Sequence, residues 1–206
     1  MNKEMKKGFT LVEMLIVIGI MSILAAASVI GYSKIIKSAR RTKNQELVAN
    51  VATALTHILS KEGVWPQELI DGAKNGDGKL DKEAAKAFIR HRMLGLAYNI
   101  RTGTEGNYTL VGKDRCGIVD AEAEAVLKRN KGAKESTKVP SGGTVDDHIL
   151  RYAIDTDGDG ITETQSFGNI RASAVVWSSG PDGKVEYQFR GRNDDVYSWR
   201  AAQVVK

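Results

Sequence analysis

The sequence contains few of the residues that build covalent or catalytic centres. Of its 206 residues one is Cys and three are His, so an internal disulfide is excluded and no zinc-ligand spacing occurs. It has no phosphate-binding glycine loop and no Gly-x-Ser-x-Gly motif, and Cys116 has no obvious base in the sequence. A second long hydrophobic run is also missing, which excludes a multi-pass membrane protein. These absences indicate that the chain is not an enzyme.

Proline is scarce as well, and the first of the three prolines is Pro66. The sequence therefore predicts one uninterrupted helix over residues 9–62. Its first half, residues 9–30, has 17 apolar residues of 22 and a single charge, Glu13. Such a segment reaches about 33 Å as a helix, which is enough to cross a bilayer core. Its second half, residues 31–62, is amphipathic, because apolar residues recur at helical spacing, and it is predicted to pack on the rest of the chain.

Positive charge precedes the hydrophobic run. Lys3, Lys6 and Lys7 keep the N-terminus in the cytoplasm under the positive-inside rule, and they supply part of the net charge of +5. The other basic residues are scattered among acids, so no nucleic-acid partner is expected. A buried core helix, a plain anchor and a secretory signal peptide cleaved within Ala25–Ala27 are the alternative interpretations. A Glu13 carboxylate in hydrocarbon is costly, so its presence indicates a specific role.

The stretch KKGFTLVEMLIVIGIMSILAA resembles the class III signal of type IV pilins and type II secretion pseudopilins. The resemblance implies that a prepilin peptidase removes the leader, residues 1–8, by cutting between Gly8 and Phe9. It also implies that the same enzyme N-methylates Phe9, and that Glu13 neutralises the amine of Phe9 on a neighbouring subunit during assembly. Two unpaired charges in hydrocarbon are costly, so their pairing favours one axial register of the filament.

Residues 63–206 are predicted to form a periplasmic head of short helices and antiparallel strands. Helices are predicted from Asp81 to about Leu94 and after Asp120, because Asp is a favourable N-cap. The predicted class is α+β: a pilin-like ladle whose long N-terminal helix packs on a small antiparallel sheet. The strand candidates are Leu96–Arg101, Asn107–Val111, Ile149–Ile154, Arg171–Ser178 and Val185–Arg190.

One acidic loop of the head is a candidate Ca²⁺ site by its spacing. Asp155, Asp157 and Asp159 stand at alternate positions and Gly160 follows, so several oxygens can point at one centre. The pattern resembles the start of an EF-hand loop. A solvated turn between strands is the alternative interpretation.

A second acidic cluster lies near the end of the chain. A Gly-x-Asp-Gly turn with Asp182, then Asp194 and Asp195 before Trp199, resembles the C-terminal end of type II secretion major pseudopilins. That resemblance implies a structural Ca²⁺ with these three carboxylates as side-chain ligands, whereas an ordinary hairpin with exposed acids is the alternative. Many type IVa pilins close this region with two Cys, which a chain with only Cys116 cannot do.

The resemblance implies a filament subunit, and specifically a major pseudopilin of a type II secretion system. Such a subunit is a single-pass inner-membrane protein with a cytoplasmic N-terminus and a periplasmic head. It assembles as a homo-oligomer into a helical pseudopilus that drives protein export. The implied partners are a prepilin peptidase, an inner-membrane assembly platform and minor pseudopilins. The alternatives are a type IV pilin for adhesion, motility or DNA uptake, and a secreted Ca²⁺-binding module released by signal peptidase.

Overall fold

The chain divides into two compact units, Met1–Ala39 and Arg40–Lys206, which we call the stem and the head. The boundary between them falls within the first helix, α1 (Leu11–Glu62). One helix therefore belongs to both units and meets two different environments. The computed structural model describes residues 9–74, 77–90, 100–102, 108–110, 115–186 and 194–205.

The stem is helical, and its described side chains are largely open to solvent. Every side chain from Phe9 to Ala26 is exposed, and within the described residues the buried core begins only at Asn44. Among the residues that the structure describes, no helix is long and apolar enough to cross a membrane.

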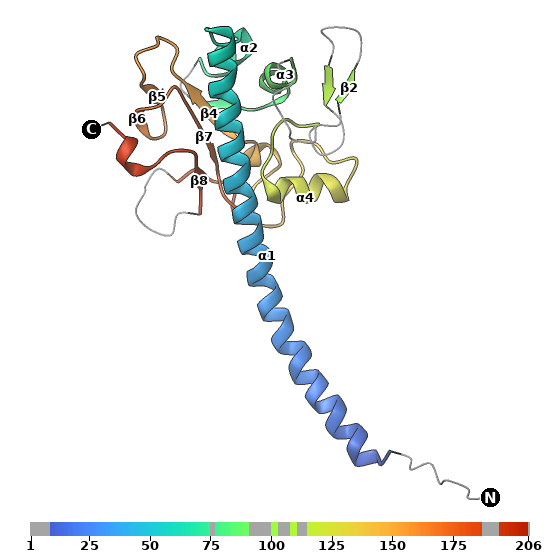
Figure 1. Cartoon of the computed structure of the whole chain (residues 1–206). Helices are drawn as coiled ribbons and strands as arrows, with labels where there is room; N and C mark the ends of the chain where they lie inside the picture. The colour runs from blue at the N-terminus through green and yellow to red at the C-terminus, as the bar shows by residue number, and fades with distance from the viewer. Residues whose placement is uncertain are drawn as a thin grey trace, which may run out of the picture. The chain divides into compact units, whose positions relative to one another are not determined.

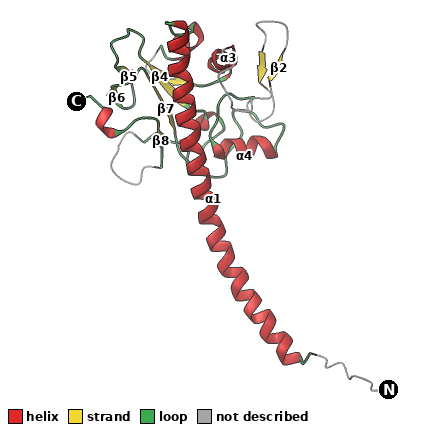
Figure 2. Cartoon of the chain, viewed as in Figure 1, coloured by secondary structure: helices red, strands yellow, loops and turns green. Residues whose placement is uncertain are grey.

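The head contains short helices and a small antiparallel sheet (Figures 1 and 2). The sheet has the strand order β1-β4-β7-β8, and β2–β3 and β5–β6 form separate antiparallel pairs. Among the described residues, 3₁₀ turns lie at Asp146–His148 and Ala201–Gln203. The elements are α2 (Gln67–Gly72), β1 (Gly78–Lys79), α3 (Lys82–Arg90), β2 (Ile100–Thr102), β3 (Tyr108–Leu110), α4 (Ala121–Arg129), β4 (Arg151–Ile154), β5 (Thr162–Thr164), β6 (Gly168–Ile170), β7 (Ala174–Ser178) and β8 (Val196–Tyr197).

Alternation along the central strands gives the head two apolar clusters. Tyr152 and Val176 are cross-strand partners on the face that packs with α1, where Val48, Val51, Leu55 and Ile58 lie at helical spacing. Trp177 points to the other face and packs with residues of the second cluster. Burying each such side chain contributes about 1.5–3 kcal/mol. The head is therefore stabilised by its own core, to which the second half of α1 contributes.

The structure confirms the α+β class and the single helix through residues 11–62. Both predicted N-caps are present: Asp81 Oδ1 accepts hydrogen bonds from Glu83 N and Ala84 N, each at 3.0 Å. Asp120 Oδ1 accepts two in the same way at the start of α4. These bonds satisfy backbone donors that have no partner within the helix.

Several predicted boundaries were wrong by a few residues. The strand predicted from Arg171 begins at Ala174, and the one predicted from Ile149 begins at Arg151, because Ile149 makes an isolated bridge to Val119 instead. The strand predicted over 185–190 lies partly outside the described residues, and its first two residues are not in a strand.

Candidate functional site

The first candidate site is the apolar surface of the stem. Phe9 is 77% exposed, and the large apolar side chains from there to Leu24 are between 44% and 81% exposed. Soluble proteins rarely expose a continuous apolar surface of this length without a partner or a membrane to cover it. The surface can therefore pack against other helices or against lipid. Gly8, the predicted cleavage residue, lies outside the described residues.

Glu13 is tied to the start of α1 by a reciprocal capping arrangement. Thr10 N and Thr10 Oγ1 each donate to Glu13 Oε2 at 2.8 Å, and Glu13 N donates to Thr10 Oγ1 at 3.3 Å. This is the pattern of a capping box, in which an acid three residues after the cap satisfies a free backbone donor. Local hydrogen bonds thus place a carboxylate within the apolar surface, where it can accept a further hydrogen bond from a cationic group.

The three acids of the first predicted Ca²⁺ loop do come together. Carboxylate oxygens of Asp155, Asp157 and Asp159 all lie within 4.8 Å of one another. Gly158 N and Gly160 N donate to the two oxygens of Asp155 at 2.7 and 2.8 Å. Both glycines have positive φ, 80° and 82°, which lets the loop turn tightly beneath the carboxylates. The arrangement offers hard oxygen ligands of the kind that Ca²⁺ prefers.

The pKa of Asp155 reflects the same geometry. Burial alone raises the pKa of this carboxyl, but the hydrogen bonds from Gly160 and Gly158 lower it by more, so the net pKa lies below its ordinary value. The group is therefore ionised at neutral pH, as a cation ligand must be.

The second predicted Ca²⁺ cluster is less compact in the described residues. Asp182 Oδ1 accepts from Lys184 N at 2.9 Å, whereas Asp195 Oδ2 accepts from Glu186 N at 2.7 Å and from Tyr197 Oη at 3.0 Å. These three acids do not form a group of mutually close ligand oxygens of the kind found in the first loop, within the part of the chain that the structure describes.

The acids of the second cluster nevertheless affect one another. Burial, followed by the charges of Asp182 and Glu186, raises the pKa of Asp194. Burial also raises the pKa of Asp195 to about 7. Asp194 Oδ1 lies close to Gly180, where an added Cβ would come within 2.7 Å of it. A nearby cation would relieve the repulsion among these carboxylates.

The structure also shows a buried polar network that sequence reasoning missed. His148, 1% exposed, contacts Asp120 Oδ2 through Nδ1 at 2.8 Å and the Gly142 carbonyl through Nε2 at 2.9 Å. Both partners are acceptors, so a protonated imidazolium with two N–H donors satisfies both contacts. Asp120 and His148 are 28 residues apart, so no local pattern in the sequence indicates the pair.

Comparisons with known proteins concern the N-terminal part of the chain. Residues 5–29 match the family described as the prokaryotic N-terminal methylation motif. Fimbrial protein EcpC of Eikenella corrodens is 35% identical over 68 residues, which cover 33% of this chain and 44% of that protein. The aligned part thus spans less than half of the length of this curated relative. No solved structure matches the chain significantly. The methylation motif and the fimbrial relative support a type IV pilin-like protein.

Proposed function

We propose that this chain is a pseudopilin, the filament subunit of a type II secretion system. The observation that supports it most is the methylation motif at residues 5–29, followed by a long helix whose apolar side chains up to Leu24 are exposed. In this proposal residues 9–30 anchor the subunit in the inner membrane and later pack in the filament. The head lies in the periplasm, and the assembled pseudopilus drives protein export.

Maturation and assembly are assigned to three residues. A prepilin peptidase cuts between Gly8 and Phe9 and methylates the new amine of Phe9. The carboxylate of Glu13 then pairs with the Phe9 amine of a neighbouring copy. Each charge costs free energy in an apolar surrounding, and pairing offsets that cost in one register only. An inner-membrane assembly platform and minor pseudopilins are the further partners of this proposal.

Structural Ca²⁺ is part of the proposal for the head. Asp182, Asp194 and Asp195 are the ligands proposed for the C-terminal loop, because burial and neighbouring acids raise the pKa values of Asp194 and Asp195, and a cation would stabilise the ionised form of these two carboxylates. The loop of Asp155, Asp157 and Asp159 is the second proposed position, supported by its close carboxylate oxygens. Each position supplies the oxygen ligands that suit Ca²⁺.

A surface type IV pilin for adhesion, motility or DNA uptake is the second candidate function. The fimbrial relative favours it. The single Cys and the C-terminal acids favour the pseudopilin, because one Cys cannot form the loop disulfide of many type IVa pilins. The two candidates share the same maturation and the same helix-packed filament.

A comparison of a deletion strain with its complemented strain distinguishes the two candidate functions. The gene is deleted in its own host, and secretion of extracellular enzymes, surface piliation, twitching and transformation are compared with the complemented strain. A secretion defect with normal twitching and transformation supports the pseudopilin, and the reverse supports the surface pilin. Mass spectrometry of the mature protein tests what both share: N-methyl-Phe9 is expected, whereas a start near Ser28 would contradict a filament subunit.

A further inference from the structure

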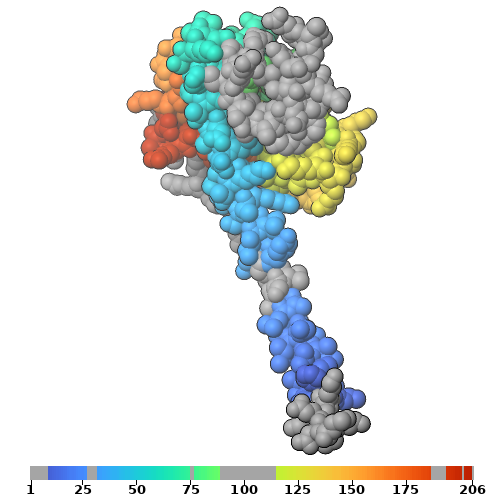
Figure 3. Space-filling model, turned by 45° about the vertical axis from the view of Figure 1, so that its right-hand side comes forward, coloured from blue at the N-terminus to red at the C-terminus, as the bar shows by residue number. Residues whose placement is uncertain are grey.

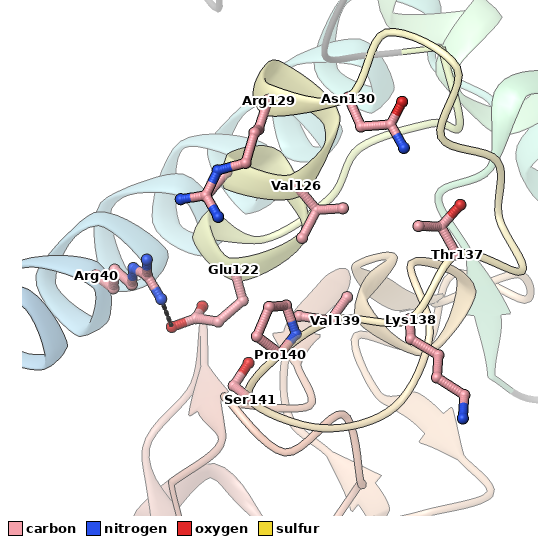
Figure 4. A pocket seen from close by; sticks show the side chains of 11 residues that line it. Arg40, Glu122, Val126, Arg129, Asn130, Thr137, Lys138, Val139, Pro140 and Ser141 are labelled. Atoms are coloured by element: carbon pink, nitrogen blue, oxygen red, sulfur yellow. Dashed lines mark ion pairs between the residues drawn. The ribbon is translucent and has the colours of Figure 1, made fainter.

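The head has a pocket of about 400 Å³ between α4 and the facing segment 137–141 (Figure 4). Val126 of α4 and Pro140 of the facing segment supply apolar walls, while Arg40, Arg129 and Lys138 supply cationic groups. The segment is held in place by hydrogen bonds from Val145 N to the Thr137 carbonyl at 2.9 Å and from Val139 N to the Gly143 carbonyl at 3.0 Å. The pocket is thus a fixed feature of the head and not a gap beside a loose loop.

The charges that line the pocket do not cancel. Glu122 is 4% exposed, and its carboxylate lies 4.0 Å from the Arg40 guanidinium and accepts from Asn44 Nδ2 at 3.2 Å. This acid therefore offsets one cation. Arg129 and Lys138 are exposed on either side of Val126 and Pro140 in Figure 4, and neither forms an ion pair with any residue that the structure describes. The pocket keeps a net charge of about +2, which suits an anionic group.

The same head presents a matching acidic loop elsewhere on its surface. Asp157 and Asp159 are exposed, and nothing lies within 4 Å of a Cβ added at Gly158 or Gly160, so the loop is open to approach. The loop lies between β4 and β5, on the other side of the head from α4 in both Figure 1 and Figure 3. With Asp155 it carries a charge of −3, and a bound Ca²⁺ would leave −1, so its sign stays opposite to that of the pocket.

We propose that the pocket at α4 receives the acidic loop 155–160 of a second copy of this chain, which rests on the filament function proposed above. A concave basic site and an acidic turn on different sides of one molecule form a head-to-tail contact, the kind that propagates along a filament. In this contact Arg129 and Lys138 pair with Asp157 and Asp159. Opposite charges of this kind fix orientation and register more than they add affinity.

Cross-linking of assembled filaments tests the contact directly. The full chain carrying Arg129→Cys and Asp157→Cys is assembled in cells, and isolated filaments are treated with a short bismaleimide. A ladder of covalently linked oligomers is expected for the double variant and not for either single variant. The matched control pairs Arg129→Cys with Asp71→Cys, another exposed acid of the head, and is expected to give no ladder. Cys116 is buried and is expected to stay unreacted.

A charge swap supplies the second readout. Arg129→Glu with Lys138→Glu, or Asp157→Lys with Asp159→Lys, is expected to lower filament yield about tenfold, because like charges then face each other. Combining all four changes in one chain is expected to restore the yield. Thermal unfolding of each variant, measured with and without a chelator, reports whether the head is still folded. It also separates loss of the charge contact from loss of an ion at Asp157 and Asp159, which are proposed above as Ca²⁺ ligands.

The outcomes separate this contact from the filament function. Normal filaments from the unaltered chain with no ladder in the double variant, or a swap that fails to restore the yield, would overturn the contact alone. Failure of the unaltered chain to form filaments in its own host would overturn the filament function and this contact with it.

Discussion

The stem and the head use the same helix in opposite ways. In the stem, the apolar side chains of α1 are exposed on all of its sides from Leu11 to Leu24. In the head, Val48, Val51, Leu55 and Ile58 of the same helix are fully buried against the sheet. The head buries its apolar side chains within one chain, whereas the apolar side chains of the stem can be buried only against lipid or other subunits. The difference indicates that the buried core that stabilises the folded chain lies in the head, and that the exposed apolar surface lies in the stem.

Replacing Glu13 with Ala should prevent filament assembly through the stem and leave the fold of the head unchanged. We expect normal cleavage after Gly8 but a complete loss of filaments, because the Phe9 amine of the neighbouring copy then has no partner in an apolar surrounding. Electron microscopy of sheared filaments measures the effect, and mass spectrometry confirms processing. Glu46→Ala, which removes another exposed acid of α1, is the matched control and should assemble normally. Normal filaments from the Glu13 variant would refute the ion pair.

Replacing Trp177 with Ala should instead destabilise the fold of the head. Trp177 is 0% exposed and packs edge-to-face against Phe167 and Trp199, with ring centroids 5.4 and 5.8 Å apart. We expect the free energy of unfolding to fall by about 3–5 kcal/mol, as for other large buried aromatics. Leu15→Ala in the stem is the control and should leave the unfolding of the head unchanged. Fluorescence of the remaining tryptophans, all in the head, follows the unfolding of the full chain in detergent.

Removing Ca²⁺ should lower the stability of the head if the head binds a structural ion. A single ion present at 100 times its Kd stabilises a protein by about 2.7 kcal/mol, so chelation should lower the Tm by a corresponding amount. Asp194→Asn should abolish the response to chelator if the C-terminal loop holds the ion, and Asp157→Asn should abolish it if the loop before β5 does. Asp71→Asn is the control, because this exposed acid pairs with Lys74 and belongs to neither cluster. An unchanged Tm in the unaltered protein would exclude a structural ion.

The pH dependence of the head should depend on His148. Burial lowers the pKa of His148, but the hydrogen bond and charge of Asp120 raise it by more, so the folded pKa lies above the ordinary value of 6.5. A group whose pKa is raised by folding stabilises the protein fully below its unfolded pKa, and that contribution is lost as the pH rises through the folded value. We therefore expect stability to fall above pH 6.5, by at most about 1.4 kcal/mol per pH unit for this proton.

A matched variant isolates this effect. His148→Gln keeps a polar side chain at the position but cannot titrate, so it should remove this part of the pH dependence. His57→Gln, on the exposed side of α1, should leave the profile unchanged. A profile of the His148 variant that matches the unaltered protein would show that other groups control it.

Local patterns in the sequence were enough to predict the long helix, the starts of two short helices and several strands, whereas α2, β1, β5, β6 and β8 were not predicted. The absence of Pro before Pro66 predicted the uninterrupted α1, and Asp81 and Asp120 predicted the starts of α3 and α4, because helix interruption and capping involve only neighbouring residues. The close carboxylates of Asp155, Asp157 and Asp159 were predicted for the same reason, since one tight loop carries all three. The N-terminal motif likewise lies in one continuous stretch.

Tertiary structure decided what depends on distant segments. Asp120 and His148 meet only because the folding of the head brings α4 and the turn at residues 146–148 together. The pocket at α4 exists only because the segment 137–141 returns to face the helix. The sequence by itself determined which half of α1 is apolar throughout and which is one-sided. Only the fold decided which polar groups are buried in pairs, because their partners are set by packing across the head and not by spacing along the chain.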